Sequence, residues 1–415
     1  MAADYYLRTR CRMCDGANIE RVMSLTPTPP GNNFLKRGEL ERAEPAYPLD
    51  LFLCMECHHV QLGHVVDPRI LYQNDYTYVS GTAAVFVRHL QDYAADMIAR
   101  FGLRTGALVS DIGSNDGTCL RFFQEAGMNV VGVDPATDIA LRATATGVPT
   151  VPAFFSEALA RELRSMHGPA AFITSHNACA HIDQLDDVMR GVAHWLDHDG
   201  VFVLEVGYLV DVYSKLLFDT IYHEHLDYHT VEPFEKLFAR TGLELISVKR
   251  IEPQGGSIRV MAQKVGSRLT RDTSAAALIG AEQALGLHDP ATFAAFETRI
   301  SGLGKKLRTL IGSLKAQGKS IAAYGAPTKA TTLLSHFCIG AESLDFIVDD
   351  NPLKQHLHSP LSHIPVLPTA ELYRRQPDFV LILAWNFAQP IMTMHQRYTE
   401  LGGRFILPMP EPRLA

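Results

Sequence analysis

From about residue 105, short apolar runs rich in β-branched residues alternate with amphipathic stretches of helical spacing. The first run, ALVSDIGSNDGT at 107–118, ends in a turn of glycine, asparagine and aspartate and leads into the amphipathic LRFFQEAG. Further runs of this kind follow at 129–136, 148–155, 170–182 and 200–208. Strands and helices that alternate in this way predict an α/β fold with a parallel, doubly wound sheet, whose ligands lie outside the carboxyl ends of the strands.

A second α/β pattern occupies the C-terminal part of the chain. A glycine pair in EPQGGSIRV (252–260) precedes a strand, and a long helical stretch then ends near AQGKS (316–320). Strand-like runs follow within 320–334, 344–352 and 378–387, the first of them with a glycine turn and a helix. This pattern predicts a second Rossmann-like unit that lacks the complete dinucleotide fingerprint.

The composition is that of an ordinary globular protein with two or three domains: 415 residues, 47% of them hydrophobic and 20% charged. A formal net charge of −7 argues against nucleic-acid binding as the main task, because such proteins carry a basic surplus. No apolar run approaches the roughly 20 residues that span a bilayer, and MAADYYLRTR lacks the apolar core of a signal peptide. We therefore expect a cytoplasmic protein without membrane contact, and nothing in the sequence requires a protein partner beyond a monomer.

Four of the seven cysteines form two CxxC pairs near the N-terminus, Cys11 with Cys14 and Cys54 with Cys57. Four thiolates fill the tetrahedral sphere of Zn²⁺ and leave no open position for a substrate, so the spacing predicts one structural zinc ion. A redox CxxC and a catalytic zinc are the less favoured alternatives. The proline-rich TPTPPGNNF (26–34) predicts a loop between the pairs, and His58 and His59 are expected at the surface.

The turn after the first strand carries two glycines, Gly113 and Gly117, which let the backbone pass close to a ligand. Asp134 ends the second strand and follows Asp111 by the separation expected of a carboxylate that binds ribose hydroxyls. Folds for NAD and for S-adenosylmethionine share this arrangement. However, Asn115 stands where a pyrophosphate-binding turn has its middle glycine, and the nearby carboxylates repel a pyrophosphate but attract a sulfonium. The charges therefore favour S-adenosylmethionine.

A dense group of titratable residues, IYHEHLDYHT at 221–230, follows the fifth strand. Its HExH spacing differs from the HExxH of zinc proteases, because histidines two apart do not share a helix face. Methyl transfer to carbon needs a base that first removes a proton, and a neutral imidazole suits this task. His181 and Tyr76 are also expected to reach the cleft. The alternatives are a hydrogen-bonded loop for the histidines of 221–230, helix capping for His181 and aromatic packing for Tyr76.

In the C-terminal unit, SIAAYGAPTKATTLL places Lys329 in the first turn of a helix. A helix N-terminus beside a lysine suits an anion, so we expect a phosphate or diphosphate there. A solvated Lys329 is the alternative.

Together these motifs resemble one family, the deoxysugar C-methyltransferases, and within it the branch that methylates C-3′ of a dTDP-linked sugar in D-tetronitrose formation. The resemblance rests on the two CxxC pairs, DIGSNDGT, EHLDYHT, GGSIR, YGAPTKATTLL and VDDNP, and covers nearly the whole chain. It implies three domains: a zinc-binding lobe (1–75), a Rossmann-like methyltransferase domain that binds S-adenosylmethionine (76–265), and a second Rossmann-like domain that contributes to nucleotide-sugar binding (266–415). The implied substrate is a dTDP-linked 4-keto deoxysugar, with a 3-amino group expected, in antibiotic sugar biosynthesis.

The resemblance also implies roles for single residues. His225 takes the C-3 proton, which the adjacent ketone makes acidic, and Glu224 orients the histidine or the sugar amine. Tyr222, with His181 or Tyr76, donates a hydrogen bond to the enolate oxygen. Contacts to the cofactor are expected from Asp111, Gly113, Asn115, Asp134 and Asn177, and contacts to the diphosphate from Lys329 and Asn386.

Two other functions remain open at this point. One of the two Rossmann-like units could serve a nicotinamide-dependent oxidoreductase. A zinc-lobed binding protein without catalysis, in which the histidines are structural, is the second.

Overall fold

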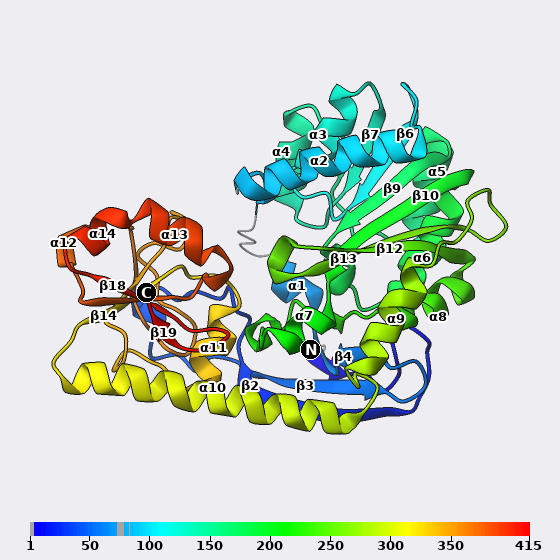
Figure 1. Cartoon of the computed structure of the whole chain (residues 1–415). Coiled ribbons are helices and arrows are strands. Elements are labelled where there is room, and N and C mark those ends of the chain that lie inside the picture. The colour runs from blue at the N-terminus through cyan, green and yellow to red at the C-terminus, as the bar shows by residue number, and fades with distance from the viewer. Residues whose placement is uncertain (1–3, 73–78, 83) are drawn as a thin grey trace.

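Four β-sheets organise the chain in the computed structural model, which describes residues 4–72, 79–82 and 84–415 (Figure 1). A four-stranded and a two-stranded sheet form the N-terminal lobe, a seven-stranded sheet the central part and a six-stranded sheet the C-terminal part. This arrangement confirms the predicted α/β class. Within these ranges, every helix is too short or too polar to span a lipid bilayer.

The lobe is built around an antiparallel sheet in the order β11-β4-β3-β2. Its strands are β2 (Ile19–Thr28), β3 (Tyr47–Cys54), β4 (Val60–Leu62) and β11 (Asp227–Tyr228), and beside it β1 (Tyr5–Leu7) pairs with β5 (His64–Val66). Buried and half-buried residues alternate along β3, as expected for a strand with one face on a core. The predicted loop at 26–34 begins later than expected, because β2 continues to Thr28.

The central sheet has the order β12-β13-β10-β9-β6-β7-β8. Its strands are β6 (Leu108–Ile112), β7 (Asn129–Val133), β8 (Thr150–Val151), β9 (Ala170–His176), β10 (Leu196–Gly207), β12 (Leu243–Ile251) and β13 (Ser257–Lys264). The strands from β6 to β10 are parallel, as predicted. The sequence pattern did not predict that β13 runs antiparallel to both of its neighbours.

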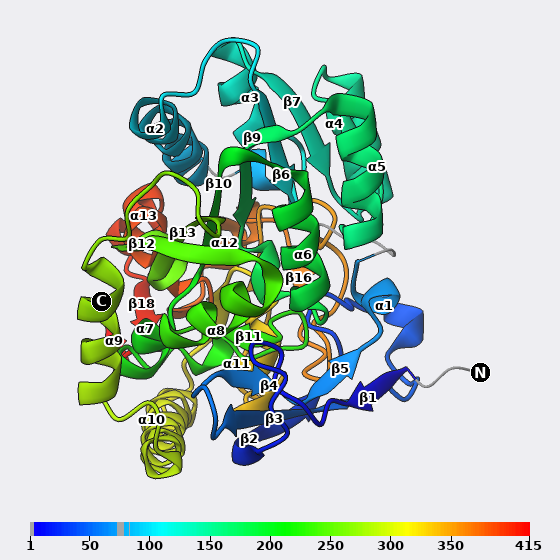
Figure 2. The same ribbon diagram turned by 90° about the vertical axis from the view of Figure 1, so that its right-hand side faces the viewer.

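Helices cover both faces of this sheet, as Figures 1 and 2 show. They are α2 (Ala84–Phe101), α3 (Thr118–Glu125), α4 (Thr137–Ala145), α5 (Glu157–His167) and α6 (Leu185–Trp195). Neighbouring residues of β9 point to opposite faces, so Phe172 belongs to one core with Leu90 of α2 and Phe123 of α3. Ile173 belongs to the other core, with Leu163 of α5.

The C-terminal sheet has the order β16-β15-β14-β17-β18-β19, and β19 is antiparallel to the otherwise parallel strands. Its strands are β14 (Ile321–Tyr324), β15 (Ile347–Val348), β16 (Val366–Leu367), β17 (Phe379–Ile382), β18 (Arg404–Leu407) and β19 (Arg413–Leu414). The helices of this part are α11 (Ala330–His336), α12 (Ala370–Arg375), α13 (Ala388–Met394) and α14 (Gln396–Glu400).

The helix α10 (Pro290–Ala316) runs beneath the lobe sheet and leads into the C-terminal part (Figure 1). One face of it is apolar at helical spacing, with the buried residues Phe293, Phe296, Ile300, Leu303, Leu307, Ile311 and Leu314. The remaining helices are α1 (Pro68–Tyr72), α7 (Leu209–Ser214), α8 (Glu232–Thr241) and α9 (Ser274–Ala284).

Candidate active site

A cavity of about 670 Å³ opens at the carboxyl ends of the central strands, where the three parts of the chain meet. The ends of β6, β7, β9 and β10 all contribute to its wall. Asn32 reaches it from the lobe, and Lys329 and Asn386 reach it from the C-terminal part. This is the edge where the fold class predicts ligands.

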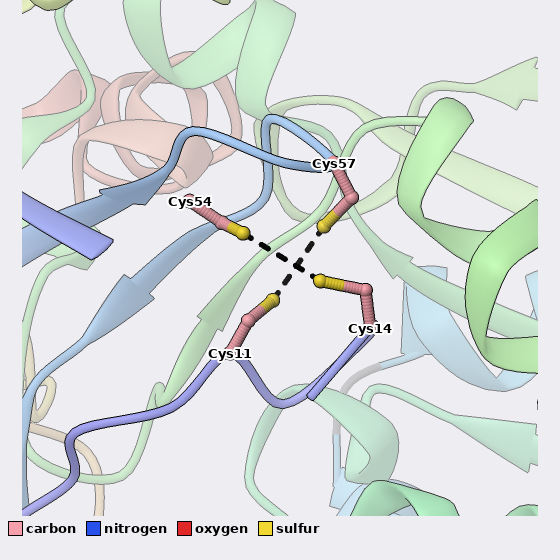
Figure 3. Close-up of side chains that lie close together, drawn as sticks. All are labelled: Cys11, Cys14, Cys54 and Cys57. Carbon is pink, nitrogen blue, oxygen red and sulfur yellow. Dashed lines mark hydrogen bonds between the residues drawn. The ribbon is translucent and has the colours of Figure 1, made fainter. Parts of the chain in front are cut away.

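The four paired cysteines converge on one point of the lobe (Figure 3). The Sγ atoms of Cys11 and Cys57 lie 3.5 Å apart, those of Cys14 and Cys54 lie 3.6 Å apart, and all four lie within 4.8 Å of one another. Zinc–sulfur bonds of about 2.3 Å in a tetrahedron place the sulfur atoms about 3.8 Å apart, so the cluster fits a zinc ion. Because the four thiols take every ligand position, such an ion would hold structure.

The glycine turn after β6 is fixed by the carboxylate of Asp134. Its Oδ2 accepts a hydrogen bond from the backbone nitrogen of Asn115 at 2.8 Å, and its Oδ1 accepts one from that of Ala136 at 2.9 Å. Gly113 has a φ of +77°, and a Cβ there would lie 2.4 Å from the Cβ of Ala178. The turn after β9 therefore comes too close for any other residue at position 113.

Asp111 and His176 lie at the same end of the cavity, with Nδ1 of His176 4.0 Å from Oδ1 of Asp111. Among the described residues, Oδ1 of Asp111 and both ring nitrogens of His176 have no hydrogen-bond partner. Burial and the neighbouring Asp134 raise the pKa of Asp111 well above its usual range. A cationic ligand would satisfy this carboxyl group, so the site fits the ammonium group of S-adenosylmethionine. Asn177, the next residue after His176, also lines the cavity.

Tyr222 and His225 form a hydrogen-bonded pair on the cavity wall. Nδ1 of His225 lies 2.8 Å from the carbonyl oxygen of Thr220, which only accepts, so Nδ1 carries the proton. The unprotonated Nε2 then accepts the hydroxyl hydrogen of Tyr222 over 2.8 Å. Burial, assisted by the nearby Lys329, lowers the pKa of His225 to about 4, so the imidazole is a neutral base at physiological pH.

His181 and Glu224 lie beside this pair. The ring centroids of His181 and His225 are 4.9 Å apart, and Nε2 of His181 has no hydrogen-bond partner within the described ranges. Burial raises the pKa of Glu224 to about 7, and the amide of Asn32 donates to its carboxylate. Tyr76, the fifth residue expected here, lies outside the described residues.

Lys329 is half-buried and has partners within the protein, rather than being freely solvated. Its ammonium group donates a hydrogen bond of 2.8 Å to Oδ1 of Asn386 and lies 3.5 Å from the ring centroid of Trp385. The indole nitrogen of Trp385 in turn donates to the buried Asp219. Burial lowers the pKa of Lys329 to about 8. The two residues expected at the diphosphate thus contact each other at the cavity wall.

His59 corrects the sequence analysis, which placed it at the surface. Its side chain is fully buried, and Nε2 donates a 2.7 Å hydrogen bond to Oδ1 of Asp227. His58 is half-buried and contacts Glu232. Asn32 also lines the cavity, and nothing in the sequence around it indicates this position, because the lobe meets the cavity only through the fold.

Three family models match the chain in succession. Residues 11–72 match a zinc binding domain, residues 86–248 a methyltransferase domain and residues 252–410 a C-methyltransferase C-terminal domain. The chain is 35% identical to C-methyltransferase NovU of Streptomyces niveus over 404 residues, which cover 97% of this chain and 96% of NovU.

Solved structures show a weaker similarity. Magnesium protoporphyrin IX methyltransferase of Synechocystis PCC 6803, with bound S-adenosylmethionine, is 14% identical, with a TM-score of 0.33 over 43% of this chain and 81% of that one. An S-adenosylmethionine-dependent methyltransferase of Clostridium acetobutylicum is also 14% identical, with a TM-score of 0.36 over 43% of this chain and 92% of that one.

Proposed function

Because the chain belongs to the C-methyltransferase family and is an S-adenosylmethionine-dependent enzyme of it, we propose that it methylates C-3′ of a dTDP-linked 4-keto deoxysugar. We propose a 3-amino sugar as the acceptor, in the biosynthesis of an antibiotic sugar. Membership in the C-methyltransferase family argues against the two alternatives, a nicotinamide-dependent oxidoreductase and a binding protein without catalysis.

The observation that carries the proposal is the protonation state of His225. A hydrogen next to a ketone is weakly acidic, and its removal needs a neutral base together with a donor for the oxygen that becomes negative. His225 offers an unprotonated Nε2 with the hydroxyl of Tyr222 attached, in a cavity that also holds the glycine turn. The hydrogen-bonded pair of His225 and Tyr222 therefore favours a role in enolisation over a purely structural role in the loop.

In the proposed reaction, Nε2 of His225 takes the proton from C-3′, and the electrons of that bond move into the enolate. Tyr222 turns its hydroxyl from His225 to the enolate oxygen, where His181 or Tyr76 supplies a second donor. Glu224, which holds a proton up to about pH 7, orients His225 or the sugar amine. Bound S-adenosylmethionine would supply the methyl group: the carbon–carbon bond at C-3′ would form as the sulfur–methyl bond breaks, with S-adenosylhomocysteine as the second product.

The cofactor and the nucleotide occupy the two ends of the cavity in this proposal. Asp111, Gly113, Asn115, Asp134 and Asn177 hold S-adenosylmethionine, with Asp111 opposite its ammonium group. Lys329 and Asn386 hold the diphosphate, because Lys329 carries the single Lys or Arg side chain among the described residues that line the cavity.

A screen of nucleotide sugars with mass detection of one added methyl group tests the proposal. We expect a gain of one methyl group on dTDP-linked 4-keto sugars and none on the matching 4-hydroxy sugars, which have no acidic hydrogen at C-3′. Methylation of the 4-hydroxy sugars, or of an oxygen or nitrogen atom, would overturn the proposed mechanism.

A further inference from the structure

The segment 221–230, here called the histidine loop, contacts both the cavity and the lobe. Tyr222, Glu224 and His225 line the cavity. His223, between them, is buried and donates from Nε2 to the carbonyl oxygen of Thr28 at the end of β2, over 2.8 Å. The loop is therefore attached to the lobe through His223, which lies between the proposed catalytic residues Tyr222 and His225.

A second attachment lies two residues beyond His225. Asp227 begins β11, which pairs with β4 of the lobe, and the backbone nitrogen of Leu62 donates to the carbonyl oxygen of Leu226 at 2.8 Å. The carboxylate of Asp227 is fully buried and accepts the 2.7 Å hydrogen bond from His59. The guanidinium of Arg12 lies 3.9 Å from the same oxygen atom, Oδ1.

Both of these side chains lie within or directly after a cysteine pair. Arg12 stands between Cys11 and Cys14, and His59 follows Cys57 by two residues. The side chain of Arg12 is fully buried. It donates to the carbonyl oxygen of Leu62 at 2.9 Å, to that of Leu226 at 3.3 Å and to Asp183 at 2.9 Å.

We propose that Arg12 and His59 are positioning residues through which the closed four-cysteine cluster fixes the histidine loop, and with it Tyr222 and His225. The proposal rests on the function proposed above for His225. When the four cysteines bind zinc, the backbone of both cysteine pairs is fixed. Arg12 and His59 then contact Asp227 in one geometry. Without zinc, the buried guanidinium of Arg12 and the buried carboxylate of Asp227 are no longer held together, and the histidine loop becomes more mobile.

Hydrogen exchange of the purified, zinc-loaded protein without substrates measures this freedom directly. We expect amide exchange in peptides from 221–230 to be about tenfold faster in Arg12→Met and in His59→Leu than in the wild type. The matched controls are Arg10→Met and His58→Leu, which alter neighbouring side chains that contact Asp15 and Glu232 instead of the loop. Both controls should exchange as the wild type does.

Arg12→Met and His59→Leu keep all four cysteines, so each variant should retain about one zinc ion per chain. Their kcat should fall by about 100-fold, the effect of a small misplacement of catalytic groups, while the dissociation constant of S-adenosylmethionine changes less than twofold. If Arg12→Met does not fold, His59→Leu alone decides. Wild-type exchange in the loop of a folded variant, or an equal loss of cofactor affinity, would overturn the proposal.

Removal of zinc by a chelator provides a second readout. Exchange in 221–230 should rise, while peptides of β14 in the C-terminal part keep their protection; unchanged exchange in the loop would overturn the proposal. Neither exchange measurement needs turnover. An active His225→Asn variant would therefore refute the proposed base without affecting these results, so the two failures are distinguishable.

Discussion

Asn32 of the lobe donates a hydrogen bond from its side-chain nitrogen to Oε1 of Glu224, over 3.1 Å. The two residues are 192 positions apart in sequence. Lys354 of the C-terminal part lies near enough to lower the pKa of Glu224, although burial raises it more. All three parts of the chain therefore set the charge of one carboxyl group at the cavity.

The first prediction concerns this carboxyl group. The pKa of Glu224 rises from 4.5 to about 7, so between these pH values the folded state holds a proton that the unfolded state has lost. Relative to Glu224→Gln, the wild type should thus lose up to about 1.4 kcal/mol of stability per pH unit across this window, because the other titrating groups are common to both proteins. Thermal unfolding of both proteins from pH 4.5 to 8 checks this; curves that stay parallel would contradict it.

Replacement of His225 by asparagine should abolish turnover while the fold remains. Asparagine can still donate to the carbonyl oxygen of Thr220, but it offers no basic nitrogen to the sugar. We expect kcat to fall by about 10³-fold or more, with a melting temperature close to that of the wild type. Washout of deuterium from C-3′ should disappear in parallel. A variant that still exchanges this deuterium would show that another group is the base.

The pH dependence of the wild-type enzyme should reveal the same histidine. With the pKa of His225 lowered to about 4, the base stays neutral well below pH 6.5. Protonation of His225 should therefore not lower kcat/KM between pH 8 and 5, whereas below pH 4 it should lower kcat/KM about tenfold per pH unit. Enzyme returned from each pH to neutrality serves as the control for acid unfolding. An acidic limb centred near 6.5 would argue against a buried base.

Asp111 provides a test of the cofactor end. Asp111→Asn should weaken the binding of S-adenosylmethionine by about 10- to 100-fold, because a charge-assisted contact to the ammonium group is lost. Calorimetric titration measures this. Cys119→Ala, which changes a buried neighbour of Asp111 without altering its charge, should bind as the wild type does. Equal affinities in all three proteins would place the ammonium group elsewhere.

Metal analysis tests the lobe. The purified protein should contain about one zinc ion per chain, and Cys54→Ser should lower both this content and the melting temperature. Cys338→Ser is the matched control, because Cys338 is exposed and far from the cluster in sequence. Folded wild-type protein without metal would contradict the prediction.

Local signals in the sequence were sufficient for much of the fold. The CxxC spacing places four sulfur atoms together because the chemistry of the metal demands it, and the alternation from residue 107 to 208 predicts the parallel strands. The turn from Asp111 to Asn115 is identifiable from its sequence, because close approach of the backbone to a ligand requires glycine. At Gly113 a Cβ would lie 2.4 Å from the Cβ of Ala178. In each case the local pattern of residues is itself the signal, whatever the distance in sequence between the segments that come together.

Other features depend on contacts between distant segments. His59 looks like a surface residue next to a cysteine, and only the pairing of β11 with β4 brings Asp227 to it. The reversal of β13 likewise follows from packing of the sheet edge and has no local marker. Lys329 was expected either to bind an anion or to be solvated. Its contact with the ring of Trp385 depends on two strands more than 50 residues apart in sequence.

The four-stranded sheet of the lobe has a practical consequence for the construction of hybrid enzymes. One of its strands, β11, is supplied from residues 227 and 228, far downstream of the cysteine pairs. An exchange of the first 72 residues between relatives would therefore join a foreign sheet to a native edge strand. Hybrids that carry segment 226–229 together with the lobe should express and turn over better than those cut by linear sequence alone.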